Sequence, residues 1–333
     1  MKKVLIIAEA GVNHNGSIKI AKKLISEASK AGADIIKFQT FKADTLTTYF
    51  APKAPYQKKN SKKKENQHSM LKRLELKYEY HEKLKIFCKK KKIEFLSSGF
   101  DISDLIFLNS LNLKRFKIPS GEITNYLYLK KIASFKKEVI LSTGMSNLKE
   151  IENAIKILKS KKLKKKQIKI LHCCSDYPAE ISDINLKAIK TIKDKFNLEV
   201  GYSDHTTSNI VPSLAVMMGA TIIEKHFTLD QKMNGPDHSA SLDPENFKLM
   251  VKNIRLAEKS LGHGRKIPTK KEKINSKIVR KSIFAISDIK IGDKFTLKNI
   301  GCKRPDIGVS AIYIKKYLGK KSKKNYSKDQ VLL

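Results

Sequence analysis

The sequence predicts an α/β protein built as a (β/α)8 TIM barrel, followed by a small C-terminal domain. Short apolar runs alternate with amphipathic segments along most of the 333 residues, as in βα units that form a parallel sheet. Eight such runs, each followed by a helical stretch, fall within roughly 260 residues, the usual size of such a barrel. An open doubly wound sheet is the alternative, but no GxGxxG follows the first run, which counts against a dinucleotide-binding version.

The eight predicted strands are short and rich in aliphatic and aromatic residues. They lie near 4–8, 34–38, 93–97, 115–118, 139–142, 168–172, 199–203 and 221–225. The helical stretches repeat apolar residues every three to four positions, and they lie near 18–31, 69–91, 103–111, 147–160, 185–196, 208–218 and 244–261. The first apolar run stops at Glu9, so we interpret it as a buried strand and not as the core of a signal peptide.

The pattern changes after residue 265. We expect a barrel over 1–265, a charged linker over 266–278 and a compact domain of short strands and turns over 279–333. A polar segment over 41–66, rich in Lys and Pro, follows the second strand and is typical of an active-site loop.

The amino-acid composition argues against nucleic-acid binding and against a membrane-spanning protein. The net charge is +37, but the lysine runs are dispersed, lack interleaved aromatic residues and match no nucleic-acid motif. We therefore expect no nucleic-acid partner, although the charge could help to attract anionic substrates. No run of 18 apolar residues appears, so we expect no membrane span. The four cysteines form no CxxC pair, which favours a reducing, cytoplasmic location.

Polar residues gather at the predicted strand ends, where a (β/α)8 barrel builds its active site. Charged side chains are rarely buried without partners, so the convergence of Glu9, Lys37, Lys117 and Glu224 indicates function. Lysines and hydroxyl groups suit a phosphate and a carboxylate. The candidate residues are Glu9, Lys37, Gln39, Ser98, Lys117, Ser120, Glu122, Ser142, Ser175, Tyr177, Ser203, His205, Glu224 and His226.

Two histidines, His205 and His226, follow neighbouring strands and could share one divalent metal ion with open positions. Mn²⁺, Mg²⁺ and Co²⁺ all suit this donor set, and such an ion would act as a Lewis acid on a carbonyl oxygen. The residues alone therefore suggest that a phosphorylated anion meets an aldehyde in a lyase or synthase reaction. A barrel metallohydrolase is disfavoured because Glu9-Ala10-Gly11 stands where such enzymes usually carry His-x-His.

Several blocks of this sequence resemble the sialic acid (nonulosonic acid) synthases. They are AEAGVNHNG at 8–16, IKFQT at 36–40, FKIPSGE at 116–122, LSTGM at 141–145, LHC at 171–173, GYSDHT at 201–206, EKHFT at 224–228 and GPDH at 235–238. The tail, with RKS at 280–282 and KRP at 303–305, resembles the antifreeze-like (SAF) domain of that family.

The resemblance implies a phosphoenolpyruvate-dependent transferase that serves surface polysaccharide biosynthesis. Carbon 3 of phosphoenolpyruvate would attack the aldehyde of an open-chain, N-acylated mannosamine-type sugar. Water would then add at carbon 2, and phosphate would leave by C–O cleavage. The family resemblance also implies a domain-swapped homodimer, in which Arg304 contacts the N-acyl group in the partner's barrel.

The matched motifs also imply residue roles. His205 and His226 would hold the metal, with Mn²⁺ expected first. Glu9 or Glu122 would handle protons. Phosphoenolpyruvate would be held by Lys37, Lys117, Ser120, Ser142 and Ser203. The residues facing the sugar would be Glu9, Gln39, Glu122, Tyr177 and Asp237, with Ser98 and Ser175 also in the substrate site.

Three positions depart from the family pattern. Ser98-Gly99 replaces Thr-Pro and leaves a freer loop, Ser175-Asp176 replaces Asn or Thr and the residue after it, and Asp306 replaces Gly. The segments at 51–57 and 235–241 resemble the branch that holds both N-acetylneuraminate and N,N'-diacetyllegionaminate synthases. We expect N-acetylneuraminate synthesis from N-acetylmannosamine. The alternative is N,N'-diacetyllegionaminate synthesis from 2,4-diacetamido-2,4,6-trideoxymannose, and pseudaminate synthesis is less favoured.

Overall fold

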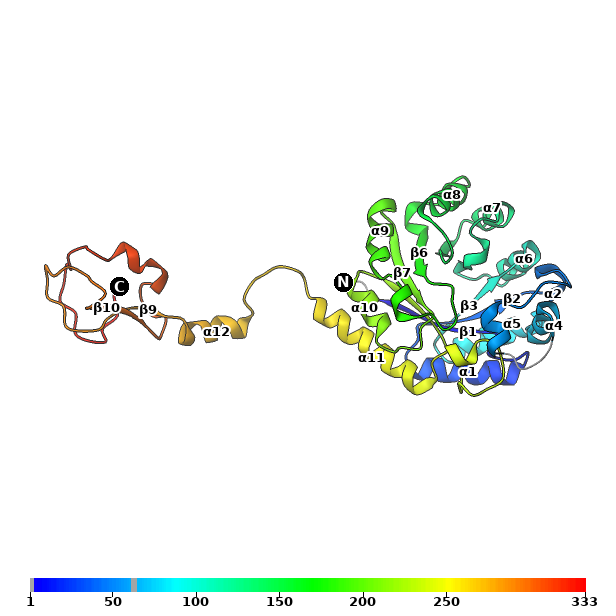
Figure 1. Cartoon of the computed structure of the whole chain (residues 1–333), viewed down its shortest axis with the longest axis horizontal. Coiled ribbons are helices and arrows are strands. Elements are labelled where there is room, and N and C mark those ends of the chain that lie inside the picture. The colour runs from blue at the N-terminus through cyan, green and yellow to red at the C-terminus, as the bar shows by residue number, and fades with distance from the viewer. Residues whose placement is uncertain (1–2, 61–64) are drawn as a thin grey trace. The chain divides into compact units, whose positions relative to one another are not determined.

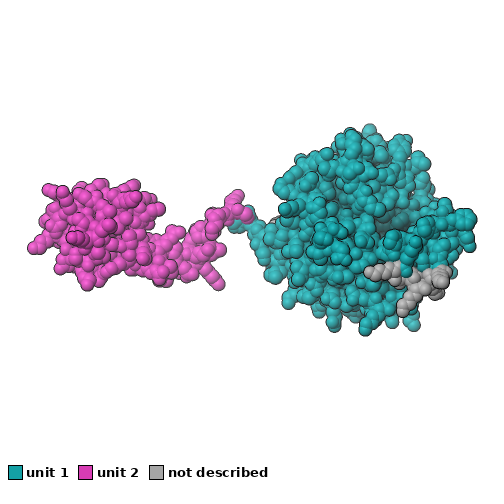
Figure 2. All heavy atoms as spheres, viewed as in Figure 1, with its two compact units in different colours: residues 1–263 teal, residues 264–333 magenta. Residues whose placement is uncertain are grey.

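The protein consists of two compact units, Met1–His263 and Gly264–Leu333 (Figure 2). The structure is a computed structural model that describes residues 3–60 and 65–333. Among these residues, no helix is long and apolar enough to cross a membrane.

The first unit is a barrel of parallel strands with helices around it (Figure 1). The strands follow one another in the order β3-β2-β1-β8-β7-β6-β5-β4, and β3 contacts β4 across the remaining seam. The predicted (β/α)8 fold is therefore confirmed, and each predicted strand overlaps an observed one. The strands are β1 (Leu5–Gly11), β2 (Ile35–Thr40), β3 (Glu94–Gly99), β4 (Arg115–Ile118), β5 (Glu138–Ser142), β6 (Ile168–Cys173), β7 (Glu199–Asp204) and β8 (Ile222–His226).

The helices of the first unit are α1 (Ile18–Lys30), α2 (Ala43–Leu46), α3 (Pro55–Asn60), α4 (Gln67–Leu74), α5 (Tyr78–Lys90), α6 (Ile102–Ser110), α7 (Tyr126–Ser134), α8 (Leu148–Lys159), α9 (Lys187–Phe196), α10 (Val211–Met217) and α11 (Pro244–Leu261). The single helix predicted over 69–91 is wrong, because the backbone leaves the helical conformation at Glu75 (φ −57°, ψ 133°) and separates α4 from α5. Helix α7, which Asn125 caps, follows β4, where the sequence analysis gave no bounds to the expected helical stretch.

The polar active-site layer lies directly above an apolar layer inside the barrel. Six inward-facing residues of this lower layer pack together: Ile7, Ile35, Leu96, Ile140, Leu171 and Ile222. Side chains on a strand alternate between its two faces, so residues two positions further along face the same interior. Those residues are Glu9, Lys37, Ser98, Ser142, Cys173 and Glu224. The two-residue alternation of side chains along each strand thus places these candidate site residues at one level of the barrel.

The opposite faces of β7 and β8 are joined by a buried ion pair. Lys225 Nζ lies 2.5 Å from Asp204 Oδ2, and both side chains are fully buried. The two residues are also direct partners in the β7–β8 ladder. Lys225 Nζ donates a further hydrogen bond to the backbone carbonyl of Thr206. Since His205 follows Asp204 and His226 follows Lys225, this pair fixes the strand ends that carry both histidines.

The second unit contains a helix and a small antiparallel sheet. Helix α12 (Lys270–Val279) precedes β9 (Ser282–Ala285), which pairs with β10 (Ile300–Lys303). Much of the predicted linker over 266–278 is therefore helical, with a capping box that joins Thr269 and Glu272. A separate apolar core holds this unit together; its buried members are Ile283, Ala285, Ile289, Phe295, Ile300, Tyr326 and Leu332.

We predict that Asp204→Ala lowers the free energy of unfolding of the barrel by about 3–5 kcal/mol, because it leaves the Lys225 ammonium buried without its carboxylate. Urea unfolding followed by far-ultraviolet circular dichroism measures this change. The matched control is Asp194→Ala, which breaks the exposed Lys190–Asp194 pair and should change stability little. Equal effects of the two substitutions would contradict a structural role for the buried pair.

Candidate active site

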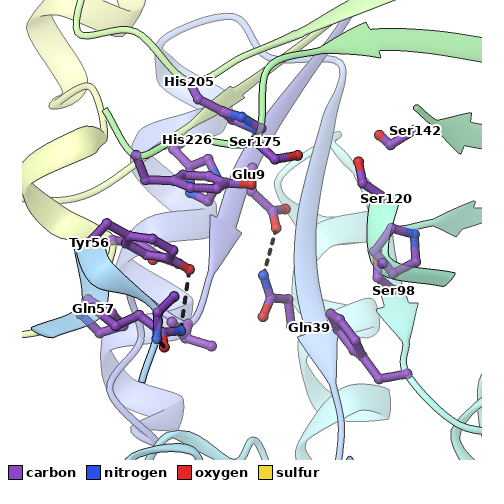
Figure 3. A pocket seen from close by; sticks show the side chains of 18 of the residues that line it. Glu9, Gln39, Tyr56, Gln57, Ser98, Ser120, Ser142, Ser175, His205 and His226 are labelled. Carbon is purple, nitrogen blue, oxygen red and sulfur yellow. Dashed lines mark hydrogen bonds between the residues drawn. The ribbon is translucent and has the colours of Figure 1, made fainter. Parts of the chain in front are cut away.

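A cavity of about 660 Å³ opens at the carboxyl ends of the strands. Figure 3 shows that its lining side chains come from several strands and from α3. Every candidate residue of the barrel lines this one cavity, while Arg304 follows β10 in the second unit. The lining residues predicted from sequence are Glu9, Lys37, Gln39, Ser98, Lys117, Ser120, Glu122, Ser142, Ser175, Tyr177, Ser203, His205, Glu224, His226 and Asp237.

Two lysines and two carboxylates form a buried cluster in the cavity. Lys37 Nζ lies 2.7 Å from Glu9 Oε2 and 3.7 Å from Glu224 Oε1. Lys117 Nζ lies 3.4 Å from the same Glu224 oxygen. All four residues are at most 5% exposed. Opposite charges in such a dry site interact strongly, but each charge has also lost its hydration.

Burial and neighbouring charges set the pKa values of this cluster. Burial raises the pKa of Glu9 to about 7, although Lys37 opposes the shift. Burial would also raise the pKa of Glu224, but Lys117 and Lys37 outweigh it and lower this pKa below its usual value. Burial lowers the pKa of Lys117. Glu9 is thus able to gain and lose a proton near neutral pH, while Glu224 stays ionised.

Hydroxyl groups surround the two ammonium groups. Lys117 Nζ donates to Ser142 Oγ at 2.7 Å, and Lys37 Nζ lies 3.4 Å from Ser98 Oγ. Ser120 Oγ accepts a hydrogen bond from the backbone N–H of Gly144 at 3.0 Å. A Cβ atom on Gly144 would lie 2.9 Å from Ser120 Oγ and 2.0 Å from Ser175 Oγ, so only glycine lets both hydroxyls approach. The arrangement suits an oxyanion with several oxygens.

The expected freedom of the loop at Ser98-Gly99 is wrong. Both residues belong to β3 and are buried. The Gly99 carbonyl also accepts a hydrogen bond from Tyr128 Oη at 2.7 Å. The backbone at this position is therefore held by the sheet and by α7, and the Ser98 hydroxyl is fixed beside Lys37.

The two histidines lie beside the cluster with their rings close together. Their ring centroids are 5.6 Å apart, and the Tyr177 ring lies 4.1 Å from His205 and 5.4 Å from His226. His205 Nδ1 contacts the carbonyl oxygen of Cys174, which can only accept a hydrogen bond. Nδ1 is therefore assigned as the protonated nitrogen, and Nε2 keeps its lone pair.

Both imidazoles suit a divalent metal ion. Burial lowers the pKa of His205 to about 4 and the pKa of His226 well below its usual value, so both rings are neutral at pH 7, the form that binds metals. His226 Nδ1 and Glu224 Oε2 are buried, and neither has a hydrogen-bond partner among the described residues. Within that same part of the chain, no group of three or more His, Cys, Asp or Glu side chains could hold a metal by itself.

Three residues of this cavity received no role from the sequence. Glu224 was recognised only as part of the charged convergence, although it bridges both lysines. Tyr56 and Gln57 of α3 also line the cavity, and the Tyr56 ring lies 4.9 Å from the Tyr177 ring. The two-residue spacing after Ile222 could have identified Glu224. Tyr56 and Gln57 lie in the active-site loop predicted over 41–66, of which 61–64 lie outside the described residues. The sequence did not assign them roles or a helix, because the segment lacks apolar periodicity.

Comparisons with known proteins identify relatives over the whole chain. A model of the NeuB family matches residues 24–266, and one of the SAF domain matches residues 280–333. The chain is 50% identical to an N,N'-diacetyllegionaminic acid synthase of Campylobacter jejuni, over 100% of this chain and 99% of the relative. It is 47% identical to an N,N'-diacetyllegionaminic acid synthase of Legionella pneumophila, over 98% and 93% of the two chains.

A solved structure is also similar. It is an N-acetylneuraminic acid synthetase from Leptospira borgpetersenii in complex with citrate, with 36% identity and a TM-score of 0.73 over 82% of this chain and 90% of that one. The higher identities to the two N,N'-diacetyllegionaminic acid synthases favour the alternative of the sequence analysis over its first expectation, N-acetylneuraminate.

The buried Asp237 gives a pH-dependent prediction. Burial raises its pKa from 3.8 to about 6, against the opposing charge of Lys37. The folded state therefore binds more protons than the unfolded state between pH 4 and 6, and stability falls as the pH rises through this window. We expect Asp237→Asn to be more stable than the parent above pH 6, by up to about 3 kcal/mol, and equally stable near pH 4.

Urea unfolding of both proteins at pH 4, 5, 6 and 7 measures this difference. Asp194→Asn on the exposed face of α9 is the matched control. A stability difference that does not change with pH would contradict the assigned burial of the Asp237 carboxylate.

Proposed function

This chain belongs to the NeuB family, the nonulosonic acid synthases, and we propose that it condenses phosphoenolpyruvate with 2,4-diacetamido-2,4,6-trideoxymannose to give N,N'-diacetyllegionaminate. The proposed class of reaction rests on one observation: two buried lysines and a ring of hydroxyl groups converge where the strands end. The choice of acceptor sugar rests on the similarity to two N,N'-diacetyllegionaminic acid synthases over nearly the whole chain.

The lysines and serines would hold phosphoenolpyruvate. Lys37 and Lys117 supply positive charge for its phosphate and carboxylate, and the hydroxyls of Ser120, Ser142 and Ser203 supply directional hydrogen bonds. An anion that binds here replaces the lost hydration of both ammonium groups. This role explains why the barrel keeps charges at a level that ordinary packing would fill with apolar side chains.

The carbon–carbon bond would form between carbon 3 of phosphoenolpyruvate and the aldehyde carbon of the sugar. The aldehyde oxygen takes up a proton, and Glu9 is suited to supply it because its pKa lies near 7. Water then adds at carbon 2 and loses a proton, for which Glu122 is the second candidate carrier. The bond between carbon 2 and the phosphate oxygen breaks last, which leaves the 2-keto group and inorganic phosphate.

A divalent metal, Mn²⁺ first, would be held by His205 and His226 and would supply Lewis-acid polarisation of the aldehyde oxygen. The Cys174 carbonyl orients His205 by accepting a hydrogen bond from its Nδ1. Gln39, Tyr177 and Asp237 would face the hydroxyl and amide groups of the sugar. We further propose that Arg304 of a second copy contacts an N-acyl group, as in a domain-swapped dimer.

The test is phosphate release from phosphoenolpyruvate with Mn²⁺, with the diacetamido sugar and N-acetylmannosamine run side by side. We expect turnover with the diacetamido sugar, at least tenfold lower kcat/KM with N-acetylmannosamine, and loss of activity in EDTA that Mn²⁺ restores. Turnover of N-acetylmannosamine alone would reverse the choice of sugar. Full activity in EDTA would refute the proposed requirement for a divalent metal ion.

An experiment with two variants, first alone and then mixed, tests the role of the metal site and the role of Arg304 separately. His205→Ala should lose Mn²⁺ binding in an electron paramagnetic resonance titration and should lose turnover. Arg304→Ala should keep Mn²⁺ binding and raise the KM of the sugar about tenfold or more, because a charge-assisted hydrogen bond is lost. If Arg304 acts in the partner's barrel, mixed dimers of the two variants contain one site with both residues.

Refolding the two variants together should therefore recover the parental sugar KM in a fraction of the sites. His68→Ala, on α4 outside the histidine pair, is the control and should keep Mn²⁺ binding and turnover. Absence of recovery in a mixture that forms dimers would contradict the partner role of Arg304.

A further inference from the structure

The cavity has a second side, opposite the phosphate-binding residues, that no role described so far explains. In Figure 3, Ser98, Ser120 and Ser142 lie on one side, and Tyr56 and Gln57 lie on the other, with Glu9 and Gln39 between them. If phosphoenolpyruvate occupies the serine side and the aldehyde lies near the histidines, the far carbons of the acceptor sugar point toward α3. The groups on α3 would therefore contact the sugar at carbons 4 to 6.

Gln57 holds Tyr56 in place, and among residues 3–60 and 65–333 no acceptor takes the Tyr56 hydroxyl hydrogen. Gln57 is 8% exposed, and its Nε2 donates to Tyr56 Oη at 3.3 Å. Gln57 Oε1 accepts from the backbone N–H of Ala54 at 3.0 Å and from Gln67 Nε2 at 3.4 Å. Because the Tyr56 oxygen already accepts a hydrogen bond, its own hydrogen remains available for an acceptor on a ligand.

An apolar wall lies in the same cavity. Part of the segment between β2 and β3 packs with the loops after β1 and β3 in one cluster that is separate from the main core. Six of its members also line the cavity: Val12, Leu46, Met70, Leu71, Leu74 and Phe100. This wall offers no hydrogen bond to a sugar hydroxyl, and apolar surface favours methyl groups.

The two candidate sugars differ at the carbons that would face these groups. The diacetamido sugar has an acetamido group at carbon 4 and a methyl group at carbon 6, whereas N-acetylmannosamine has hydroxyl groups on both carbons. An acetamido carbonyl is a strong acceptor for a phenol hydroxyl, and the methyl groups of the diacetamido sugar suit the apolar wall. N-acetylmannosamine would leave its carbon 6 hydroxyl against apolar side chains.

We propose that Tyr56, oriented by Gln57, selects the acceptor by donating its hydroxyl hydrogen to the carbon 4 acetamido carbonyl, while the apolar wall holds the methyl groups. This inference rests on the proposed function, because it assigns a residue to the feature that distinguishes the two sugars. It makes Tyr56 a specificity residue and gives it no part in bond making.

The test compares Tyr56→Phe with the parent on three acceptors: the diacetamido sugar, 2-acetamido-2,6-dideoxymannose and N-acetylmannosamine. The second sugar differs from the first only at carbon 4, where a hydroxyl group replaces the acetamido group. Values of kcat/KM are used, or inhibition constants where turnover is too slow. We expect the preference for the diacetamido sugar over the second sugar to fall about tenfold, as for the loss of one hydrogen bond. The KM of phosphoenolpyruvate should stay at its parental value.

Tyr49→Phe is the matched control, because Tyr49 lies in the same segment and is 62% exposed. It should leave the preference unchanged. An equal loss on all acceptors in Tyr56→Phe, or no loss on any, would overturn the role of Tyr56 and leave the proposed function standing. A parent protein that does not use the diacetamido sugar would overturn the proposed function, and this inference with it.

Discussion

The buried contact between Glu9 and Lys37, extended by Glu224 and Lys117, is the constraint on which the site depends. Four ionisable side chains in a dry barrel interior add little net stability, since their attraction is offset by lost hydration. Their arrangement is instead suited to receive an anion. The lysines are not fully neutralised by the carboxylates, because Glu9 has a pKa near 7 and exchanges its proton easily. A bound phosphate would complete the charge balance.

The barrel supports this cluster from two sides. Below it, an apolar layer that includes Ile7 and Leu171 closes the interior and excludes water. Behind the histidines, the Lys225–Asp204 pair holds β7 and β8 in register. Stability thus resides in the lower layer and in the outer faces of the strands, while the carboxyl ends carry groups that are costly to bury, such as Asp237. This division is typical of (β/α)8 barrels.

Sequence alone predicted the strands and the ring of polar residues at their ends, because a two-residue period along buried strands places Glu9 or Lys37 on a known face. It did not predict α2 and α3, since their segment has no apolar period and is shaped by contacts such as those of Gln57, and it merged α4 and α5 into one helix. Nor did it distinguish the linker from α12, although Thr269 and Glu272 form a capping box that is visible in the sequence. The choice of acceptor sugar required comparison with related proteins, because the polar residues at the strand ends do not distinguish the two sugars.

The most direct measurement of the central claim follows the bridging oxygen of phosphoenolpyruvate. Phosphoenolpyruvate labelled with ¹⁸O between carbon 2 and phosphorus is turned over with the diacetamido sugar and Mn²⁺, and the released phosphate is examined by ³¹P nuclear magnetic resonance. The account predicts that the label leaves with the phosphate, because water adds at carbon 2 and the C–O bond breaks. Unlabelled phosphate would show P–O cleavage and would contradict the proposed reaction.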